Sequence, residues 1–534
     1  MSTADIIRTP TVKITDQFNI TSYFIDRNVE EGRGKNIAVY EEGRQLNYEE
    51  LAGMVNRCGN ALRSIGIDQE NRVLMAMPDS SEFVGVFFGA AKIAAIPIPI
   101  NPASKPEDIL YFLNDSGARA LVIQEDIWPN VSPLLSRAPR LGHVLVLPAV
   151  PSQQQKISVA PPAKVHYSFH SLPEVLQAAS PHLDPVATSS DDLAFFLYTS
   201  GSTGGPKGAV HLQHDMLVST ELYARNILQI LETDISFSVS KLFFAYGLGN
   251  GTYFPFSVGG AAVYCPHRAK PELIFDYVER FKPTLFYSVP TLYAALLQVP
   301  GDQDMSSIRY GISAGEALPS EIYTRFKERF GVSILDGIGS TEMLHIFISN
   351  RPGEIRPGST GKLVPGYEAK LIDDEGKEVS PGEIGNLWVK GDSAAAIYWR
   401  KHERTKRTMI GEWLVTGDKY SLDPDGYFTY CGRADDMLRC SGQWVSPVEV
   451  ENILITHPAV LESAIVGADD DDGLTKPKAY IVVKQGAQPP SEEELRAFLR
   501  EKLAGFKVPR WFEFVGELPK TATGKIQRFK LRSS

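Results

Sequence analysis

The loop 198–208 holds the residues best suited to chemistry, because it combines four glycines, four serine or threonine hydroxyls and one lysine, Lys207. Glycines let the backbone turn its N–H groups toward an anion, hydroxyls add donors, and Lys207 adds positive charge. The apolar run 193–197 before the loop is typical of a buried strand in a parallel sheet, and ligands gather where such strands end. The loop therefore predicts a polyphosphate site, with a nucleoside triphosphate as the natural ligand.

The loop differs from a P-loop and from a flexible linker. A P-loop has serine or threonine directly after Gly-Lys, at the start of a helix, whereas here Pro206 precedes Lys207 and Gly208 follows it. A linker is also rich in glycine and serine. The position directly after a predicted strand and the Pro-Lys-Gly ending favour a phosphate-binding loop.

Two further junctions, 312–316 and 333–342, place small residues and a carboxylate where a strand is predicted to end. Such backbone lets a flat ring lie close, and Glu316 and Glu342 can meet a hydroxyl or a metal ion. Acidic residues also cap turns, so each junction alone is weak evidence. Near the end of the chain, Lys525 follows Gly524 in a threonine-rich turn, which suits a mobile positive charge as well as an ordinary exposed lysine.

The elements that must position these residues alternate between strand and helix. Asn47 and Glu50 have the spacing of a capping box, which predicts a helix over 47–65. Periodicity predicts strands at 72–77, 120–124, 261–264 and 285–289, helices at 81–95, 216–231 and 291–299, and an extended turn at 96–100. This alternation predicts a mainly parallel α/β sheet.

The sequence pattern changes near the end of the chain. Predicted β segments separated by glycines over 385–430 precede a unit of about a hundred residues, which is a usual domain size. We therefore predict two domains, 1–434 and 435–534. Ser446 with Glu449, and Ser491 with Glu494, predict the starts of two helices. Strands are predicted at 461–466, 479–483 and 511–515, so the last domain should be a small α+β unit.

Composition narrows the partners of this 534-residue chain. A net charge of -10 argues against nucleic acid or an anionic membrane as the main partner, so any phosphate must be met by local donors. The four cysteines show no CxxC spacing, which favours a reducing cytoplasm over a disulfide framework or metal site. We expect no membrane span, because the apolar stretch 83–100 is broken by Lys92, Pro97 and Pro99. A homodimer stays open, because no motif reports on oligomeric state.

Six motifs in one order resemble those of the adenylate-forming superfamily, which includes acyl- and aryl-CoA synthetases, peptide-synthetase adenylation domains and firefly luciferase; they lie at 198–208, 314–316, 339–342, 416–418, 432–435 and 524–525. The stretches 241–249 and 341–347 are similar to those of benzoate–CoA ligases. The resemblance implies an α/β fold: a large N-terminal domain of mainly parallel α/β sheets with a β-barrel-like part, and a small mobile α+β C-terminal domain. It also implies ATP, Mg²⁺ and coenzyme A as reactants.

The resemblance implies two half-reactions. A carboxylate would attack the α-phosphate of ATP to give an acyl-adenylate and diphosphate, and the CoA thiol would then displace AMP. The residues that would bind the β- and γ-phosphates are Thr199, Ser200, Gly201, Ser202, Thr203 and Lys207. Thr341 would contact the α-phosphate and Glu342 would hold Mg²⁺. The adenine slot would be formed by Ala314, Gly315, Glu316, Asp336, Gly337 and Ile338.

The remaining roles also come from the resemblance. Asp418 would bind the ribose hydroxyls, with Arg433 beside it. Lys525 would bridge the carboxylate and the phosphate in the first half-reaction. The C-terminal domain would then rotate about Asp435 and present Ser441 and Gly442, which would line the CoA tunnel.

The acyl pocket implied by these motifs is short, ring-lined and uncharged, and its residues are Phe244, Ala245, Tyr246, Gly339, His345 and Ile346. Such a cavity suits a flat apolar acid such as benzoate. Hydroxybenzoate, aminobenzoate, cinnamate and medium-chain fatty acids stay open as substrates, and His345 could instead be an interior histidine. Alternative functions are loading of a carrier protein, a luciferase-like oxygenase and a non-catalytic nucleotide-binding protein; the presence of Lys207, Glu342, Asp418 and Lys525 argues against the last.

Overall fold

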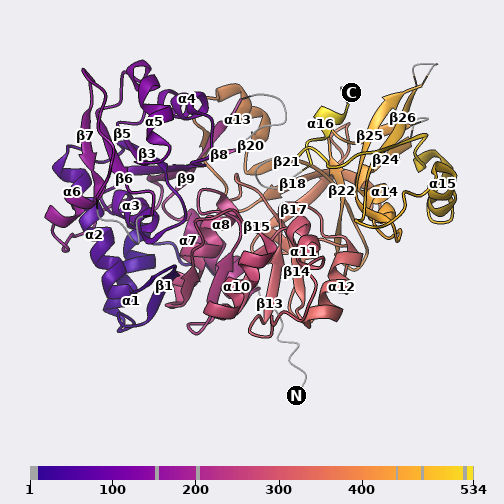
Figure 1. Ribbon diagram of the computed structural model, residues 1–534, viewed down its shortest axis with the longest axis horizontal. Helices are drawn as coiled ribbons and strands as arrows, with labels where there is room; N and C mark the ends of the chain where they lie inside the picture. Colours follow the sequence, from indigo (N-terminus) through magenta and orange to yellow (C-terminus); the bar gives the residue numbers. More distant parts are fainter. Residues whose placement is uncertain are drawn as a thin grey trace.

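The computed structural model describes residues 10–150, 156–199, 205–440, 443–470, 474–520 and 526–532. Two large sheets that contain parallel strands and two antiparallel sheets lie in the N-terminal part, and a separate C-terminal domain lies at one end of the molecule (Figure 1). Across these described ranges, no helix has the length and apolar character needed to cross a bilayer.

The first large sheet is entirely parallel. Its strands, in spatial order, are β4 (Ile96–Ile100), β3 (Arg72–Ala76), β5 (Ala120–Gln124), β6 (His143–Leu147) and β7 (Ser168–Ser171). The sequence predicts only an extended turn at 96–100, but the segment is strand β4 and pairs with β3. Pro97 and Pro99 are tolerated there because β4 is an edge strand of the ladder.

The second large sheet is parallel in its middle and antiparallel at both edges. Its strands, in spatial order, are β16 (Lys362–Leu363), β15 (Ile346–Ser349), β14 (Ile334–Gly339), β13 (Tyr310–Ser313), β12 (Leu285–Ser288), β10 (Ile235–Ser238), β11 (Ala261–Val263), β1 (Ile37–Glu41) and β2 (Arg44–Asn47). The parallel strands predicted from periodicity at 261–264 and 285–289 are β11 and β12.

Helices cover and separate the two large sheets. One apolar core joins the inner faces of both sheets, and two further cores lie on their outer faces. Between the sheets or at their ends lie α1 (Arg27–Glu30), α2 (Tyr48–Ser64), α3 (Ser81–Lys92), α6 (Leu172–Ala178), α7 (Asp215–Ser219), α8 (Ala245–Leu248) and α9 (Phe254–Val258). The outer helices are α4 (Pro106–Ser116) and α5 (Trp128–Val131) on the first sheet, and α10 (Pro271–Phe281), α11 (Pro290–Leu296) and α12 (Ser320–Phe330) on the second.

A three-stranded antiparallel sheet carries the start of the predicted phosphate site. It consists of β8 (Leu193–Thr199), β9 (Lys207–Leu212) and β19 (Ile397–Tyr398). The prediction that 193–197 belongs to a parallel sheet is therefore wrong. Only the short connection 200–206 joins β8 to β9, which is too little chain for the crossover that parallel strands require.

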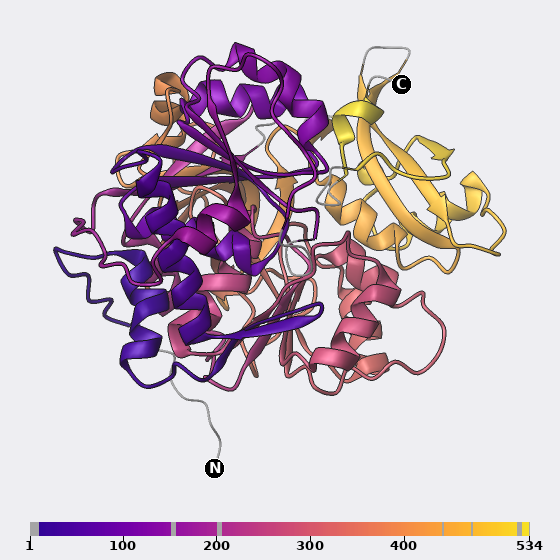
Figure 2. The ribbon, with the colours of Figure 1, turned by 60° about the vertical axis from the view of Figure 1, so that its left-hand side comes forward.

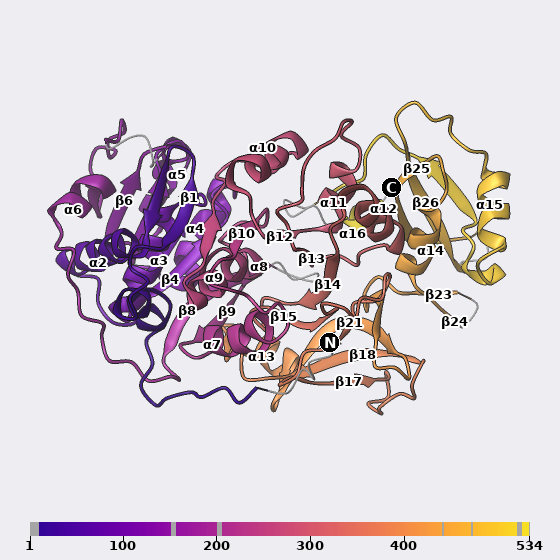
Figure 3. The same cartoon turned by 90° about the horizontal axis from the view of Figure 1, so that it is seen from below.

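The rest of the N-terminal part is an antiparallel sheet at the position where a β-barrel-like part is expected. Its strands are β17 (Glu368–Ile372), β18 (Ile384–Lys390), β20 (Met409–Ile410), β21 (Trp413–Leu422) and β22 (Phe428–Arg433), with α13 (His402–Thr408) beside them. Figure 3 shows this orange sheet below the second large sheet.

The C-terminal domain has its own apolar cores. It contains β23 (Leu438–Cys440), β24 (Gln443–Val445), α14 (Pro447–Leu454), β25 (Val460–Asp469), β26 (Thr475–Val483), α15 (Glu492–Arg500), β27 (Trp511–Phe514) and α16 (Arg528–Leu531). As predicted, the side chains of Ser446 and Ser491 cap α14 and α15, each accepting the backbone N–H three residues on. Figure 2 shows this yellow domain standing apart from the other layers.

Glycines allow α2 and α3 to pack backbone against backbone beneath the first sheet. A Cβ on Gly89 would lie 2.8 Å from the Gly59 nitrogen and 2.8 Å from the Val55 carbonyl oxygen. Backbone atoms cannot move aside as a flexible side chain can. The close approach of these two helices therefore depends on glycine at position 89.

We expect Gly89→Ala to lower the free energy of unfolding by about 2 kcal/mol or more, because it overpacks a rigid contact. The matched control is Gly53→Ala in the same helix pair, where an added Cβ meets nothing within 4 Å. That variant should raise stability by about 0.5–1 kcal/mol, because alanine favours helix. Urea unfolding followed by circular dichroism measures both, and equal midpoints for the two variants would contradict the packing argument.

Candidate active site

Lys207 and Glu342 lie together although they are distant in the sequence. Lys207 begins β9, Glu342 follows β14, and the distance from Nζ to Oε1 is 3.3 Å. The Tyr398 hydroxyl stands between them, accepting a hydrogen bond from Lys207 at 2.6 Å and donating one to Glu342 at 2.5 Å. All three side chains are largely shielded from water, so their charges interact strongly.

Tyr398 is a site residue that sequence reasoning misses. Burial and the adjacent Glu342 carboxylate raise the pKa of Tyr398, so its hydroxyl keeps its proton. The Lys207 ammonium also lies over the ring, 3.9 Å from its centroid. No motif marks Tyr398 in the sequence, and only the pairing of β19 with β9 brings it to the site.

The two predicted adenine-slot motifs lie side by side, because β13 and β14 are neighbouring parallel strands in which Ser313 pairs with Asp336. Ala314, Gly315 and Glu316 follow β13, and Gly315 has φ of +92°, which favours glycine. Glu316 accepts a hydrogen bond from the Thr291 hydroxyl at 2.9 Å.

Asp336, Gly337 and Ile338 lie within β14. The Asp336 carboxyl is buried, and burial raises its pKa to about 8. At neutral pH this carboxyl is therefore mostly protonated.

Asp418 and Arg433 form an ion pair across β21 and β22. Arg433 donates from Nη1 to Asp418 Oδ1 at 3.0 Å and to the Thr416 carbonyl at 3.2 Å. Gly417 has φ of +76°, and a Cβ there would lie 2.9 Å from Arg433 Nη2. The exposed Asp435 follows two residues after Arg433, so the predicted hinge adjoins the predicted ribose site.

An aromatic cluster surrounds His345 close to Glu342. The ring of His345 lies 5.5 Å from Tyr246, 5.5 Å from Tyr223 and 4.3 Å from Phe254, centroid to centroid. Burial lowers the pKa of His345 to about 3, so the ring is neutral at physiological pH. Its Nε2 lies 3.0 Å from the Asn250 side-chain oxygen and donates to it.

The other predicted pocket residues lie around this cluster. Ala245 and Tyr246 open α8, Phe244 is its N-cap residue, and Ile346 begins β15. Gly339 is required for space, because a Cβ would lie 2.5 Å from the His345 carbonyl oxygen. The cluster brings aromatic rings and one neutral histidine together without a charged side chain among these contacts.

Seven predicted site residues lie outside the described ranges. They are Ser200, Gly201, Ser202, Thr203, Ser441, Gly442 and Lys525.

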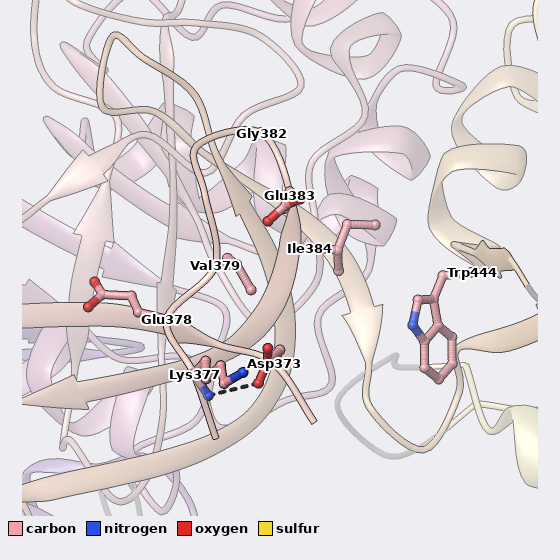
Figure 4. A pocket seen from close by; sticks show the side chains of 8 residues that line it. All are labelled: Asp373, Lys377, Glu378, Val379, Gly382, Glu383, Ile384 and Trp444. Atoms are coloured by element: carbon pink, nitrogen blue, oxygen red, sulfur yellow. Dashed lines mark hydrogen bonds between the residues drawn. The ribbon is translucent and has the colours of Figure 1, made fainter. Parts of the chain in front are cut away.

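An open pocket of about 530 Å³ lies where the C-terminal domain meets the antiparallel sheet. Figure 4 shows Trp444 of β24 facing the loop between β17 and β18. The Lys419 ammonium of β21 lies 4.8 Å from the Trp444 ring centroid. None of the predicted site residues lines this pocket, whose two walls belong to different domains.

Glu342 is suited to a magnesium ion that accompanies a nucleotide. Within the described ranges, no three His, Cys, Asp or Glu side chains gather into a metal-binding group. Mg²⁺ in nucleotide sites typically takes only one or two protein carboxylates, because phosphates and water supply its other ligands. The single partly buried Glu342 carboxylate, with Lys207 and Tyr398 beside it, fits this mode of binding.

Comparisons with known proteins agree with this geometry. Residues 25–399 match the AMP-binding enzyme family, and residues 449–525 match the AMP-binding enzyme C-terminal domain. The chain is 46% identical to a benzoate–CoA ligase of Thauera aromatica, covering 100% of this chain and 99% of that protein.

Two solved structures are also similar to the chain. A benzoate CoA ligase from Burkholderia xenovorans has a TM-score of 0.87 and 43% identity, covering 96% of this chain and 100% of that one. An anthranilate CoA ligase in complex with anthranoyl-AMP has a TM-score of 0.91 and 41% identity, covering 97% of this chain and 98% of that one. The chain therefore belongs to the AMP-binding enzyme family.

Proposed function

We propose that this enzyme is an AMP-forming benzoate–CoA ligase, which converts benzoate, ATP and CoA to benzoyl-CoA, AMP and diphosphate through a benzoyl-adenylate. The observation that carries this proposal is the neutral aromatic cluster around His345, which lies three residues beyond Glu342 in the chain. A flat, uncharged ring can pack there while its carboxylate reaches the phosphate-binding residues. The benzoate–CoA ligases among its relatives support the same substrate.

The first half-reaction brings two anions together. At about 4 Å and an effective dielectric of roughly 20, two unit charges repel by about 4 kcal/mol. Lys207 and Thr341 offset this repulsion on the phosphate side, and Tyr398 holds Lys207 and Glu342 in place. Glu342 would hold Mg²⁺, which would supply positive charge against the charge that develops on the phosphate.

The second half-reaction requires a different closure of the same site. We propose that the chain divides at 434/435 and that the C-terminal domain rotates about Asp435. Lys525 would then leave the site, and Ser441 and Gly442 would line the tunnel for the CoA thiol. Alternation between two closures lets one site carry out both steps.

The proposed setting is the cytoplasm, where ATP and CoA are available and cysteines stay reduced. All four cysteines are buried and free, which agrees with a reducing compartment. A homodimer is the oligomeric state that we propose, and light scattering after size exclusion measures it directly.

A substrate panel tests the proposed function. AMP formation with MgATP and CoA should be strongest for benzoate, weaker for hydroxybenzoates and cinnamate, and weakest for hexanoate and acetate, since a misfit by one methylene or hydroxyl costs about 1–3 kcal/mol. Mass spectrometry should find benzoyl-CoA. A different preferred acid would overturn the assignment of benzoate. Accumulated adenylate with CoA unused would instead indicate a carrier protein as acceptor.

Lys525→Ala should separate the two half-reactions. We expect loss of benzoate-dependent diphosphate formation, by at least about 100-fold, because a charge that stabilises the transition state is removed. Conversion of supplied benzoyl-adenylate and CoA to thioester should continue. The matched control is Lys520→Ala, which removes a nearby lysine that pairs with Glu462 at 2.7 Å and should change neither rate. Equal loss of both half-reactions in Lys525→Ala would refute domain rotation.

Tyr398→Phe removes the hydroxyl between Lys207 and Glu342. We expect about a tenfold slower adenylation, since a hydrogen bond to a charged group is worth about 1.5–3 kcal/mol. The control is Tyr277→Phe. The Tyr277 hydroxyl, on α10, donates to Glu42 at 2.8 Å, and its removal should leave the activity unchanged. Single-turnover kinetics measures both, and an unaffected Tyr398→Phe rate would show that Lys207 and Glu342 need no bridge.

A further inference from the structure

His211 and Asp215 form a buried pair directly behind the segment that carries Thr341. His211 lies on β9, Asp215 begins α7, and neither side chain has exposed surface. His211 Nδ1 lies 2.8 Å from Asp215 Oδ2, and its Nε2 lies 2.8 Å from the Thr341 carbonyl oxygen. A carbonyl oxygen can only accept, so His211 Nε2 carries a proton and donates it to the Thr341 carbonyl.

The surroundings of this pair hold the ring in a single orientation. The His211 ring stacks on Phe195, with 5.1 Å between centroids and 18° between planes. Asp215 Oδ2 also accepts the Leu212 N–H at 3.1 Å, and its Oδ1 lies 3.3 Å from His214 Nε2. Rotation of the imidazole would break the contact with Asp215 and the contact with Thr341 together.

A polar pair is a costly way to fill a core. Its groups lose their hydration there, and apolar side chains of similar volume often stabilise a protein equally well or better. An apolar pair could not donate a hydrogen bond to the Thr341 carbonyl. The contact with the 340–345 segment is therefore the feature that distinguishes this pair from ordinary packing.

The 340–345 segment depends on such contacts, because Leu344 has φ of +66°, a conformation that side chains other than glycine rarely adopt. Three backbone carbonyls of this segment each accept a hydrogen bond from a residue outside it. Thr341 accepts from His211 at 2.8 Å, Glu342 from the Ala395 amide at 2.7 Å, and Met343 from the Ser393 hydroxyl at 2.9 Å.

The donor His211 differs from the other two donors, Ala395 and Ser393, because it shares its strand with Lys207. Lys207 and His211 lie four residues apart on β9, and alternate residues of a strand share one face, so the two side chains point the same way. They stand about 13 Å apart along the strand. Lys207 reaches the Glu342 side chain while His211 holds the Thr341 backbone, so one strand fixes both residues.

We propose that His211, held in one orientation by Asp215, is a positioning residue that sets where Thr341 meets the α-phosphate. It acts through the Thr341 carbonyl and touches no reacting atom. This inference rests on the proposed function in one respect only, the contact of Thr341 with the α-phosphate.

Two amide variants test this role, because the glutamine amide reaches as far as Nε2 whereas the asparagine amide reaches only as far as Nδ1. His211→Asn should raise the Kd for AMP about tenfold by calorimetry, the loss of one hydrogen bond, and lower kcat for adenylation at least as much. The KM for benzoate should stay within about twofold, because the acyl pocket does not depend on this contact. His211→Gln should stay within about threefold of wild type in all three, because its amide restores the bond. Equal losses in the two variants, or unchanged AMP affinity in His211→Asn, would overturn the proposal.

Asp215→Asn provides a second test if His211→Asn does not fold. The asparagine amide holds the imidazole less firmly than the Asp215 carboxyl does, so AMP affinity should fall about threefold. Unchanged affinity there would also overturn the proposal. His166→Gln, at an exposed histidine 3.1 Å from the Ala138 carbonyl, is the control and should bind AMP normally. Because AMP binding needs no acid substrate, failure to activate benzoate would count against the proposed function alone.

Discussion

The arrangement of the candidate site depends on one antiparallel strand, β9, which fixes the side that we propose binds phosphate. Its first residue, Lys207, reaches Glu342 and Tyr398, and its fifth, His211, holds the Thr341 carbonyl. β9 is paired on both sides, with β8 and β19, so it cannot shift without breaking two ladders. The 340–345 segment has little regular structure of its own and takes its position from these contacts.

Burial controls charge differently in the two halves of the site. Around the acyl cluster it removes charge: the pKa of His345 falls to about 3, so the ring accepts no proton at neutral pH. Asp336, with a pKa raised to about 8, is also mostly neutral. On the proposed phosphate side, Lys207 lies 3.3 Å from the Glu342 carboxylate, and burial lowers the pKa of this lysine. Under the proposed function, benzoate would meet neutral surroundings for its ring and charged groups near its carboxylate.

Local sequence signals predicted the elements that depend on local interactions. The Asn47 capping box is present in full, and β5 has the predicted bounds 120–124. Predictions that required knowledge of strand partners were wrong: 96–100 is a strand, and β8 pairs antiparallel. The strand at 96–100 was missed because its two prolines argue against a strand unless it lies at the edge of a sheet, and an edge position cannot be read from sequence. The second failed because an apolar run does not reveal the direction of its neighbour.

The sequence by itself determined the family, the order of its motifs and the kinds of groups available: a lysine in a glycine-rich loop, a carboxylate after Ser-Thr, and rings near the acyl motif. It did so because motif chemistry is local. Only the tertiary structure decided which distant groups meet. Tyr398 between Lys207 and Glu342, and His211 behind Thr341, follow from pairing of β19 with β9 and from packing of β9 against the segment after β14. Those contacts join residues from remote parts of the chain, so no periodicity or spacing records them.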